Sequence, residues 1–200
     1  ADSQEVLSYA RFFIPQLRVQ LGLSYIELRL KEQAAADSGG RIDCQNYTFV
    51  LPLSDDEEKV LAQSSASNRN HVRKVYKHNW FAVSFDTGHL EPFYEVYVKR
   101  MKQLGSPAPD IFFWRHIFKY LPENAFLLTV LDQDTGDVVG GMLLLTSPTN
   151  ETVYYPYGAN LIEYNTRYLN NFMYWEAVRF GIRTKMKYLD LGRSQAGSGT

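Results

Sequence analysis

Phe126-Leu-Leu-Thr-Val-Leu131, Asp134-Thr-Gly136 and Val138-Val-Gly-Gly-Met-Leu-Leu-Leu145 follow one another along the chain and predict two strands joined by a tight turn. Both runs are short, apolar and rich in residues that favour strands. The pair Gly140-Gly141 lies inside the second run, where it indicates a bulge or a close approach of another group to the backbone.

Further strands and helices are expected on both sides of this hairpin. Apolar or alternating runs predict strands at residues 25–30, 46–51, 80–84, 152–157 and 188–191. Helical spacing of apolar residues predicts helices at 8–21, 68–78, 91–104, 110–121 and 169–181, with a further short helix after Ser54. This mixture of elements predicts an α/β fold in which helices flank a mixed sheet.

The predicted elements are unevenly distributed, and we expect two domains. Residues 1–64 offer two strands and two helices, which are too few to close a core. Residues 65–200 carry the fuller pattern and are expected to form a second domain that is truncated at its C-terminus. The chain starts without Met and stops in the glycine-rich stretch Ser194–Thr200, so we expect a piece of a longer protein.

The composition bounds the class of protein. The chain is 45% hydrophobic and has a net charge of −1, which argues against disorder and against a whole-chain field for DNA or a membrane surface. Cys44 is the only cysteine, which excludes an intrachain disulfide and favours the reducing cytoplasm. No apolar run is long enough to span a bilayer. The four histidines have no supporting carboxylate spacing, so no metal site is expected.

The helix predicted at 169–181 places a carboxylate on its apolar face. At 100° per residue, Glu176 falls in the middle of a face shared by Leu169, Phe172, Met173, Ala177 and Phe180. A buried carboxylate needs a cation or a raised pKa. We predict that Arg193, just past the neighbouring strand, is the partner. Two interpretations stay open, an acid/base group at a site and a structural ion pair.

The strand end Asp190-Leu-Gly-Arg-Ser194 is the second candidate. Glycine permits a tight turn and a close approach of a ligand to the backbone. Arg193 could hold a phosphate or carboxylate through two parallel hydrogen bonds. An ordinary surface turn with an exposed arginine is the alternative.

The helix at 68–78 is strongly basic. Arg69, Arg73 and Lys77 form a row of like charges four residues apart, which repel one another. A phosphate-bearing or polyanionic substrate would relieve that repulsion. The alternative is a solvated helix that is neutralised by the acidic residues at 55–58.

Several motifs occur together in a recognisable order. They are Asn68-Arg-Asn-His-Val-Arg-Lys-Val-Tyr-Lys77, Phe93-Tyr-Glu-Val-Tyr97, Arg100-Met-Lys-Gln-Leu-Gly105, Tyr157-Gly158, Asn171 with Tyr174-Trp-Glu176, and Asp190–Ser194 followed by Gly197-Ser-Gly-Thr200. The series resembles the Fem-like (FemAB-type) family of aminoacyl and acyl transferases, which has an acetyltransferase (GNAT)-like fold. The closest resemblance is to its branch associated with exopolysaccharide and PEP-CTERM protein-sorting systems.

The resemblance implies a domain organisation and a reaction. Residues 1–64 would be the C-terminal part of a first GNAT-like domain, and residues 65–200 a second one. An aminoacyl group from aminoacyl-tRNA, or an acyl group from acyl-CoA, would pass to an amine or hydroxyl of a cell-envelope or exopolysaccharide precursor, without a tightly bound cofactor. An acyl-CoA-dependent O- or N-acyltransferase and a non-catalytic binding module remain alternatives.

The resemblance and the residue patterns together define candidate sites. The candidate catalytic residues are Glu176, Asp190 and Arg193. The candidate substrate-binding residues are Arg73, Lys74, Lys77, Tyr157, Asn171, Trp175 and Ser194. The stretch Tyr154–Asn160 lies where an acetyltransferase would hold a donor pyrophosphate on backbone amides, but the glycine-rich signature is missing and Glu163 follows. The sequence also stops before the aromatic-Lys motif of the family.

Overall fold

A computed structural model describes residues 3–26 and 46–195, and the chain separates into two compact units, Ala1–Gln45 and Asn46–Thr200. The described part of the first unit is helix α1 (Ser3–Gln20) and the turn after it. Gly22 has a φ of +63° and allows Leu23 N to donate to Arg18 O at 2.9 Å, which closes the helix end. Most of the strand predicted at 25–30 lies outside the described residues.

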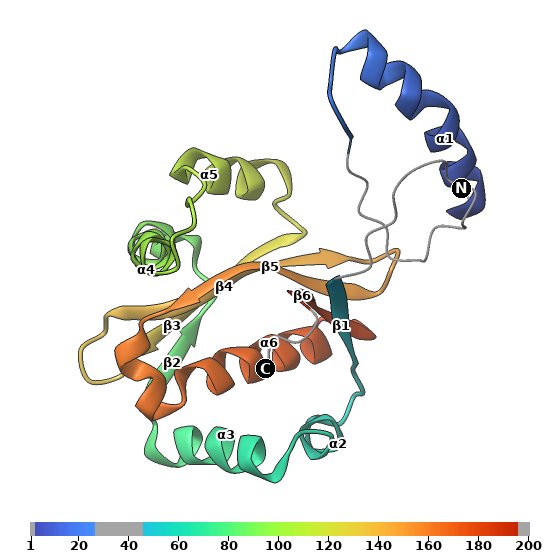
Figure 1. Cartoon of the computed structure of the whole chain (residues 1–200). Coiled ribbons are helices and arrows are strands. Elements are labelled where there is room, and N and C mark those ends of the chain that lie inside the picture. The colour runs from blue at the N-terminus through green and yellow to red at the C-terminus, as the bar shows by residue number, and fades with distance from the viewer. Residues whose placement is uncertain (1–2, 27–45, 196–200) are drawn as a thin grey trace. The chain divides into compact units, whose positions relative to one another are not determined.

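The second unit is built on one six-stranded sheet (Figure 1). Its strands are β1 (Asn46–Pro52), β2 (Phe81–Ser84), β3 (Ala125–Asp132), β4 (Val138–Ser147), β5 (Thr152–Asn160) and β6 (Tyr188–Gln195). Their order is β1-β6-β5-β4-β3-β2, and every neighbouring pair is antiparallel except β5 and β6, which are parallel. The predicted mixed sheet flanked by helices is confirmed.

Helices cover both faces of this sheet (Figure 1). On one face lies α6 (Leu169–Arg183), with α2 (Glu57–Ala62) and α3 (Ala66–His78) packed against it. On the other face lie α4 (Leu90–Gln103) and α5 (Ile111–Tyr120). The short 3₁₀ helices η2 (Thr87–His89) and η3 (Ile162–Arg167) precede α4 and α6.

The helix starts follow from capping side chains. Asp110 accepts from Phe112 N at 2.8 Å and begins α5, as predicted. Ser65 accepts from Asn68 N at 3.2 Å, so α3 begins at Ala66, two residues before the predicted start. Asp56, rather than Ser54, caps α2, because its carboxylate accepts from two amides of the first turn.

The core has two halves because adjacent strand residues point to opposite faces. Leu128 of β3 and Met142 of β4 pack in the cluster that includes α6 and α3, whereas Leu127 and Leu143 pack with α4 and α5. All four are fully buried. The hairpin predicted from the sequence is therefore the centre of the fold.

The glycine pair in β4 lies where both layers come closest to the sheet. A Cβ on Gly140 would lie 2.8 Å from the sulfur of Met173 in α6. A Cβ on Gly141 would lie 2.6 Å from Leu128 O and 2.8 Å from the ring of Phe93 in α4. The register also shifts beside Gly140, as a bulge requires. The glycine pair therefore lies beside a bulge and also permits a close approach of other groups to the backbone, which are the two roles predicted for it.

The boundary between the compact units differs from the predicted one at residue 64. β1 pairs with β6 along its length, and Glu57 of α2 forms an ion pair with Arg179 of α6. Residues 46–64 therefore belong to the same compact unit as residues 65–195 of the sheet and its helices. Whether residues before 46 belong to a sister domain stays a prediction.

We expect Gly141→Ala to lower the free energy of unfolding by about 2–3 kcal/mol, because the new methyl group meets a backbone carbonyl that cannot move freely. Gly88→Ala is the control, since its nearest neighbour is the flexible carboxylate of Asp86 at 3.2 Å, and it should cost less than about 1 kcal/mol. Urea denaturation measures both, and equal losses would contradict the packing argument.

Candidate functional site

The parallel pair β5–β6 is short, and the two strands then part. Only Thr152–Tyr154 of β5 pair with β6, and their partners are Tyr188–Asp190. At that point each strand carries a bulge. Tyr155-Pro156 of β5 lies opposite the single residue Leu144, and Leu191-Gly192 of β6 lies opposite Phe49. The separation exposes strand backbone beside two bulges, an arrangement that admits a ligand.

The strand predicted at 152–157 is present as β5 and is three residues longer than predicted. It continues as far as Asn160, paired with Gly140–Leu143 of β4. Pro156 lacks an N–H and usually ends a strand, but here it occupies the bulge, where no ladder bond is needed.

Asp190 holds the bulge of β6. The carboxylate is buried, and its Oδ1 accepts from Thr48 Oγ1 at 2.7 Å and from Gly192 N at 2.9 Å. Gly192 has a φ of +79°, and a Cβ there would lie 3.3 Å from Tyr155 O of the neighbouring strand. This carboxylate therefore sets the backbone conformation at the point where β5 and β6 part.

Arg193 and Ser194 follow directly on this bulge. Their backbones lie in β6, opposite Thr48 and Tyr47 of β1. Their side chains lie outside the part of the chain that the structure describes, so their expected contacts with a substrate stay predictions.

An aromatic cluster borders β5 on the side of α4 and α5. The Tyr157 ring lies 5.3 Å from Trp114, 5.7 Å from Phe113 and 6.4 Å from Tyr97, measured between ring centroids. Trp114 is fully buried, and its Nε1 has no acceptor within the described residues. A buried donor without an acceptor costs free energy, and this N–H is enclosed by the side chains around it.

Two other tyrosines of this region stay protonated. Burial raises the pKa of the Tyr97 hydroxyl above its ordinary value, and Tyr157 nearby adds to the shift. Burial also raises the pKa of Tyr155, whose ring meets Tyr174 edge-on at 5.5 Å. Both hydroxyls are therefore neutral hydrogen-bonding groups near pH 7.

The connection from β5 to α6 is tied down by ion pairs. Glu163 of η3 accepts from Lys99 of α4 at 2.8 Å. Arg167 lies 3.1 Å from Asp132 and 3.7 Å from Asp134, in the turn between β3 and β4. Residues 161–168 contain no glycine, and a carboxylate stands among them. This connection is not the glycine-rich cradle that would receive a pyrophosphate on backbone amides.

Glu176 is buried, as predicted, but its partner is not Arg193. Its Oε1 accepts from Arg179 Nη1 at 2.9 Å and from the hydroxyl of Tyr76 in α3. Arg179 also binds both oxygens of Glu57, at 3.0 and 3.2 Å. Arg193 stands in β6, separated in the sheet order by three strands from the β2 residues that share the Glu176 pocket.

Local spacing within α6 explains why Glu176 pairs with Arg179 and not with Arg193. Arg179 lies three residues after Glu176 on the same helix, so the two side chains meet without any tertiary pairing. That spacing was visible in the sequence. The contributions of Tyr76 and Glu57 depend on how α3 and α2 pack against α6, and no local pattern reveals them. A structural ion pair, one of the two interpretations left open, is formed.

Three of the cations of the basic helix, Arg69, Arg73 and Lys74, contact neighbouring groups, and Arg73 has an acidic partner. Arg73 pairs with Glu58 at 3.2 Å, and Arg69 donates to the carbonyls of Ala62 and Ser64. Lys74 lies over the rings of Tyr168 and Trp80, at 5.3 and 6.0 Å. The predicted neutralisation by acids at 55–58 is confirmed for Arg73.

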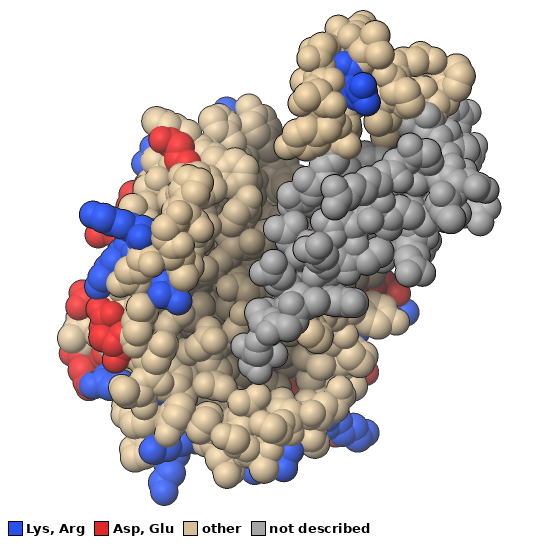
Figure 2. Space-filling view, viewed as in Figure 1, with Lys and Arg blue, Asp and Glu red and all other residues tan. Residues whose placement is uncertain are grey.

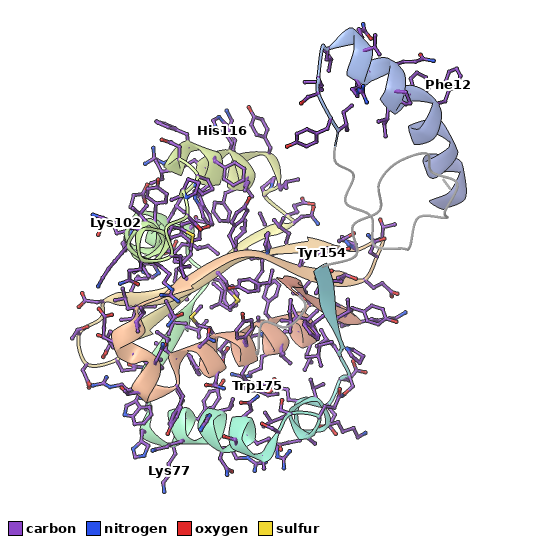
Figure 3. The ribbon with its side chains drawn as sticks, in the orientation of Figure 1. Phe12, Lys77, Lys102, His116, Tyr154 and Trp175 are labelled. Atoms are coloured by element: carbon purple, nitrogen blue, oxygen red, sulfur yellow. The ribbon has the colours of Figure 1, made fainter. Side chains whose placement is uncertain are left out.

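Three other candidates occupy different places. Lys77 is exposed and points away from the domain (Figure 3). Trp175 of α6 is 8% exposed, and its side chain lies on the side of α6 that faces α3 (Figure 3). Asn171 of α6 donates to Asn68 Oδ1 of α3 at 3.2 Å. Trp175 and Asn171 thus join α6 to its neighbours, and a direct role in binding substrate stays a prediction for each.

The charged surface has no dominant sign on the face that Figure 2 shows, where Lys and Arg side chains alternate with Asp and Glu. Within the described residues, no group of three His, Cys, Asp or Glu side chains could hold a metal ion. None of the described helices is long and apolar enough to cross a membrane.

A mixed sheet in which one parallel pair parts after three residues, with helices on both faces, is an α/β domain of three layers. Residues 64–197 match the family model of the acetyltransferase (GNAT) domain, and the chain belongs to that family. No curated protein matches the sequence.

Solved structures share the fold at low sequence identity. FemX superposes with a TM-score of 0.69 at 16% identity, over 93% of this chain and 61% of FemX. L-PGS from Bacillus licheniformis gives 0.51 at 11% identity, over 78% of this chain and 52% of its own. The C-terminal domain of a putative lysylphosphatidylglycerol synthetase from Agrobacterium fabrum gives 0.50 at 7% identity, over 75% and 49%. The chain therefore spans less than two thirds of each.

We expect Arg179→Met to lower the free energy of unfolding by about 2–3 kcal/mol, because Glu176 would stay buried without its cation. The value is reduced for the partial exposure of the arginine. Glu176→Gln keeps the hydrogen-bond acceptor and should cost about 1 kcal/mol. Chemical denaturation measures both. An unchanged free energy of unfolding in Arg179→Met would show that the ion pair does not stabilise the fold.

The hydroxyl of Tyr76 should make stability depend on pH in the alkaline range. Burial, followed by the hydrogen bond to Glu176 and the charge of that carboxylate, raises its pKa above the ordinary value of about 10. The folded state therefore holds this proton when the unfolded state loses it, and the stabilisation present below pH 10 declines as the pH rises. The stability difference between wild type and Tyr76→Phe should shrink from pH 9 to pH 11. A constant difference would contradict the assignment.

Proposed function

We propose that the protein is a Fem-like transferase that passes an aminoacyl group from aminoacyl-tRNA to an amine or hydroxyl of a cell-envelope or exopolysaccharide precursor. Membership of the GNAT family supports acyl transfer. The fold similarity to FemX and to structures named for lysylphosphatidylglycerol synthesis supports an aminoacyl group and an envelope acceptor. A charged tRNA is a cytoplasmic donor, in keeping with the expected location.

The ion pairs of the β5–α6 connection favour aminoacyl-tRNA over acyl-CoA as the donor. Glu163 and Arg167 fasten the β5–α6 connection to α4 and to the β3–β4 turn. A coenzyme A pyrophosphate would find there side chains engaged in ion pairs with other elements instead of a row of free glycine amides. Transfer from the ester of a charged tRNA does not require this connection to bind a pyrophosphate.

The reaction needs no covalent enzyme intermediate. The acceptor nitrogen or oxygen attacks the carbonyl carbon of the aminoacyl ester, and a new C–N or C–O bond forms. The C–O bond to the tRNA ribose breaks, and the proton lost by the acceptor ends on the ribose oxygen. The chain would contribute positioning and stabilisation of the oxyanion.

We assign these tasks to residues around the separation of β5 and β6. Asp190 keeps the bulge of β6 in place, and Arg193 and Ser194 follow it along the strand. Tyr157 would contact the acceptor, and the buried ring of Trp114 would support the Tyr157 ring. Glu176 is engaged with Arg179 and Tyr76, so we give it a supporting role and no proton transfer.

The full-length protein, mixed with envelope precursors, should transfer label from charged tRNA and not from acyl-CoA. Tyr157→Ala should lower kcat/KM at least tenfold, because the acceptor loses one wall of its site. Tyr188→Ala, at an exposed ring near the start of β6, is the matched control and should keep full activity.

Transfer from acyl-CoA, with no transfer from charged tRNA, would show that acyl-CoA is the donor and would contradict the proposed one. Failure with both donors, using folded protein, would favour a non-catalytic binding module and overturn the proposal.

A further inference from the structure

A groove runs along α6 on the face that looks toward α3 and the edge strand β2. Its volume is about 650 Å³, within the range of small-molecule sites. Residues from Phe172 to Arg183 line it, so it extends for about 16 Å along the helix. Its apolar walls are Phe81, Val83, Phe85, Phe126, Phe172 and Phe180.

This groove is separate from the proposed transfer site. It borders β2 and β3, whereas the transfer site lies where β5 and β6 part, and β4 stands between them in the sheet. Ligand binding in this groove would therefore be independent of the proposed transfer reaction.

The polar groups of the groove fall into two sets. Tyr76, Glu176 and Arg179 bind one another, so the two charges of this set offset each other within the groove, and Glu57, outside the groove lining, also pairs with Arg179. Arg183 is different. Its guanidinium lies 5.7 Å above the ring of Phe85, and it forms no ion pair within the described residues. It is exposed at the rim.

The amide of Asn79 also borders the groove and is exposed. Asn79 has a φ of 51° at the end of α3, which fixes its backbone at the opening. The groove therefore offers a cation and an amide, above a floor made largely of aromatic rings.

We propose that this groove binds an amphiphilic anion, a ligand with a flat apolar body and one carboxylate, phosphate or sulfonate group. The body would lie on the phenylalanine rings, which favour offset or edge contacts with another ring. The anionic group would lie at Arg183, whose planar fork of donors suits oxygen anions.

Two fluorescent probes of the same shape test the proposal with the full chain. The anion 8-anilinonaphthalene-1-sulfonate should bind saturably at one site. The uncharged N-phenyl-1-naphthylamine, which has the same ring system without the sulfonate, should bind at least fivefold more weakly. Equal affinity for the two probes, or no saturable binding, would overturn the proposal.

Variants locate the site. Arg183→Gln should weaken the sulfonate probe about fivefold and leave the uncharged probe unchanged. Arg115→Gln is the matched control, because that guanidinium also lies over a phenylalanine, at 5.5 Å from Phe112, but outside the groove. Val83→Trp should fill the groove and abolish binding of both probes, and thermal denaturation checks that it folds. If Arg183→Gln binds the sulfonate as wild type does, or Val83→Trp binds either probe as wild type does, the groove is not the site.

Discussion

The carboxylate of Asp190 accepts hydrogen bonds from Thr48 of β1 and from the amide of Gly192, and the geometry of the sheet depends on them. They hold the bulge that turns β6 away from β5 after three paired residues. A buried carboxylate is tolerated here because it is hydrogen-bonded. These hydrogen bonds support one of the two bulges at which the strands part, and the other lies in β5 at Tyr155-Pro156.

The two faces of the sheet have different tasks. On the side of α4 and α5, aromatic rings pack around Tyr157 and leave one buried donor, Trp114 Nε1, without an acceptor in the described residues. On the side of α6, Glu176 and Arg179 of α6 bind Glu57 of α2 and Tyr76 of α3, and these contacts link the three helices. The first arrangement supports the ring of Tyr157, and the second is suited to stabilising the domain.

Charge is used mainly for positioning in this protein. Ion pairs from Glu163 and Arg167 fasten the β5–α6 connection, and Glu58 neutralises Arg73. Exposed pairs of this kind add little stability individually, but they restrict where a connection can lie. The connection that could otherwise wrap a phosphate group is thereby committed to neighbouring elements. Arg183 stands apart from these networks, with an aromatic ring as its neighbour.

Local patterns in the sequence determined the strands of the central hairpin, the cap at Asp110, the mixed α/β class and the burial of Glu176, because each depends on residues close together in the chain. Tertiary structure alone decided that Pro156 sits in a bulge, that β1 joins the second unit, and that Tyr76 and Glu57 reach the α6 network. Arg179 could have been found from its spacing to Glu176, but the other contacts join residues about 100 or more positions apart. Such contacts arise only when helices and strands pack, because packing selects the partner and the chain order does not.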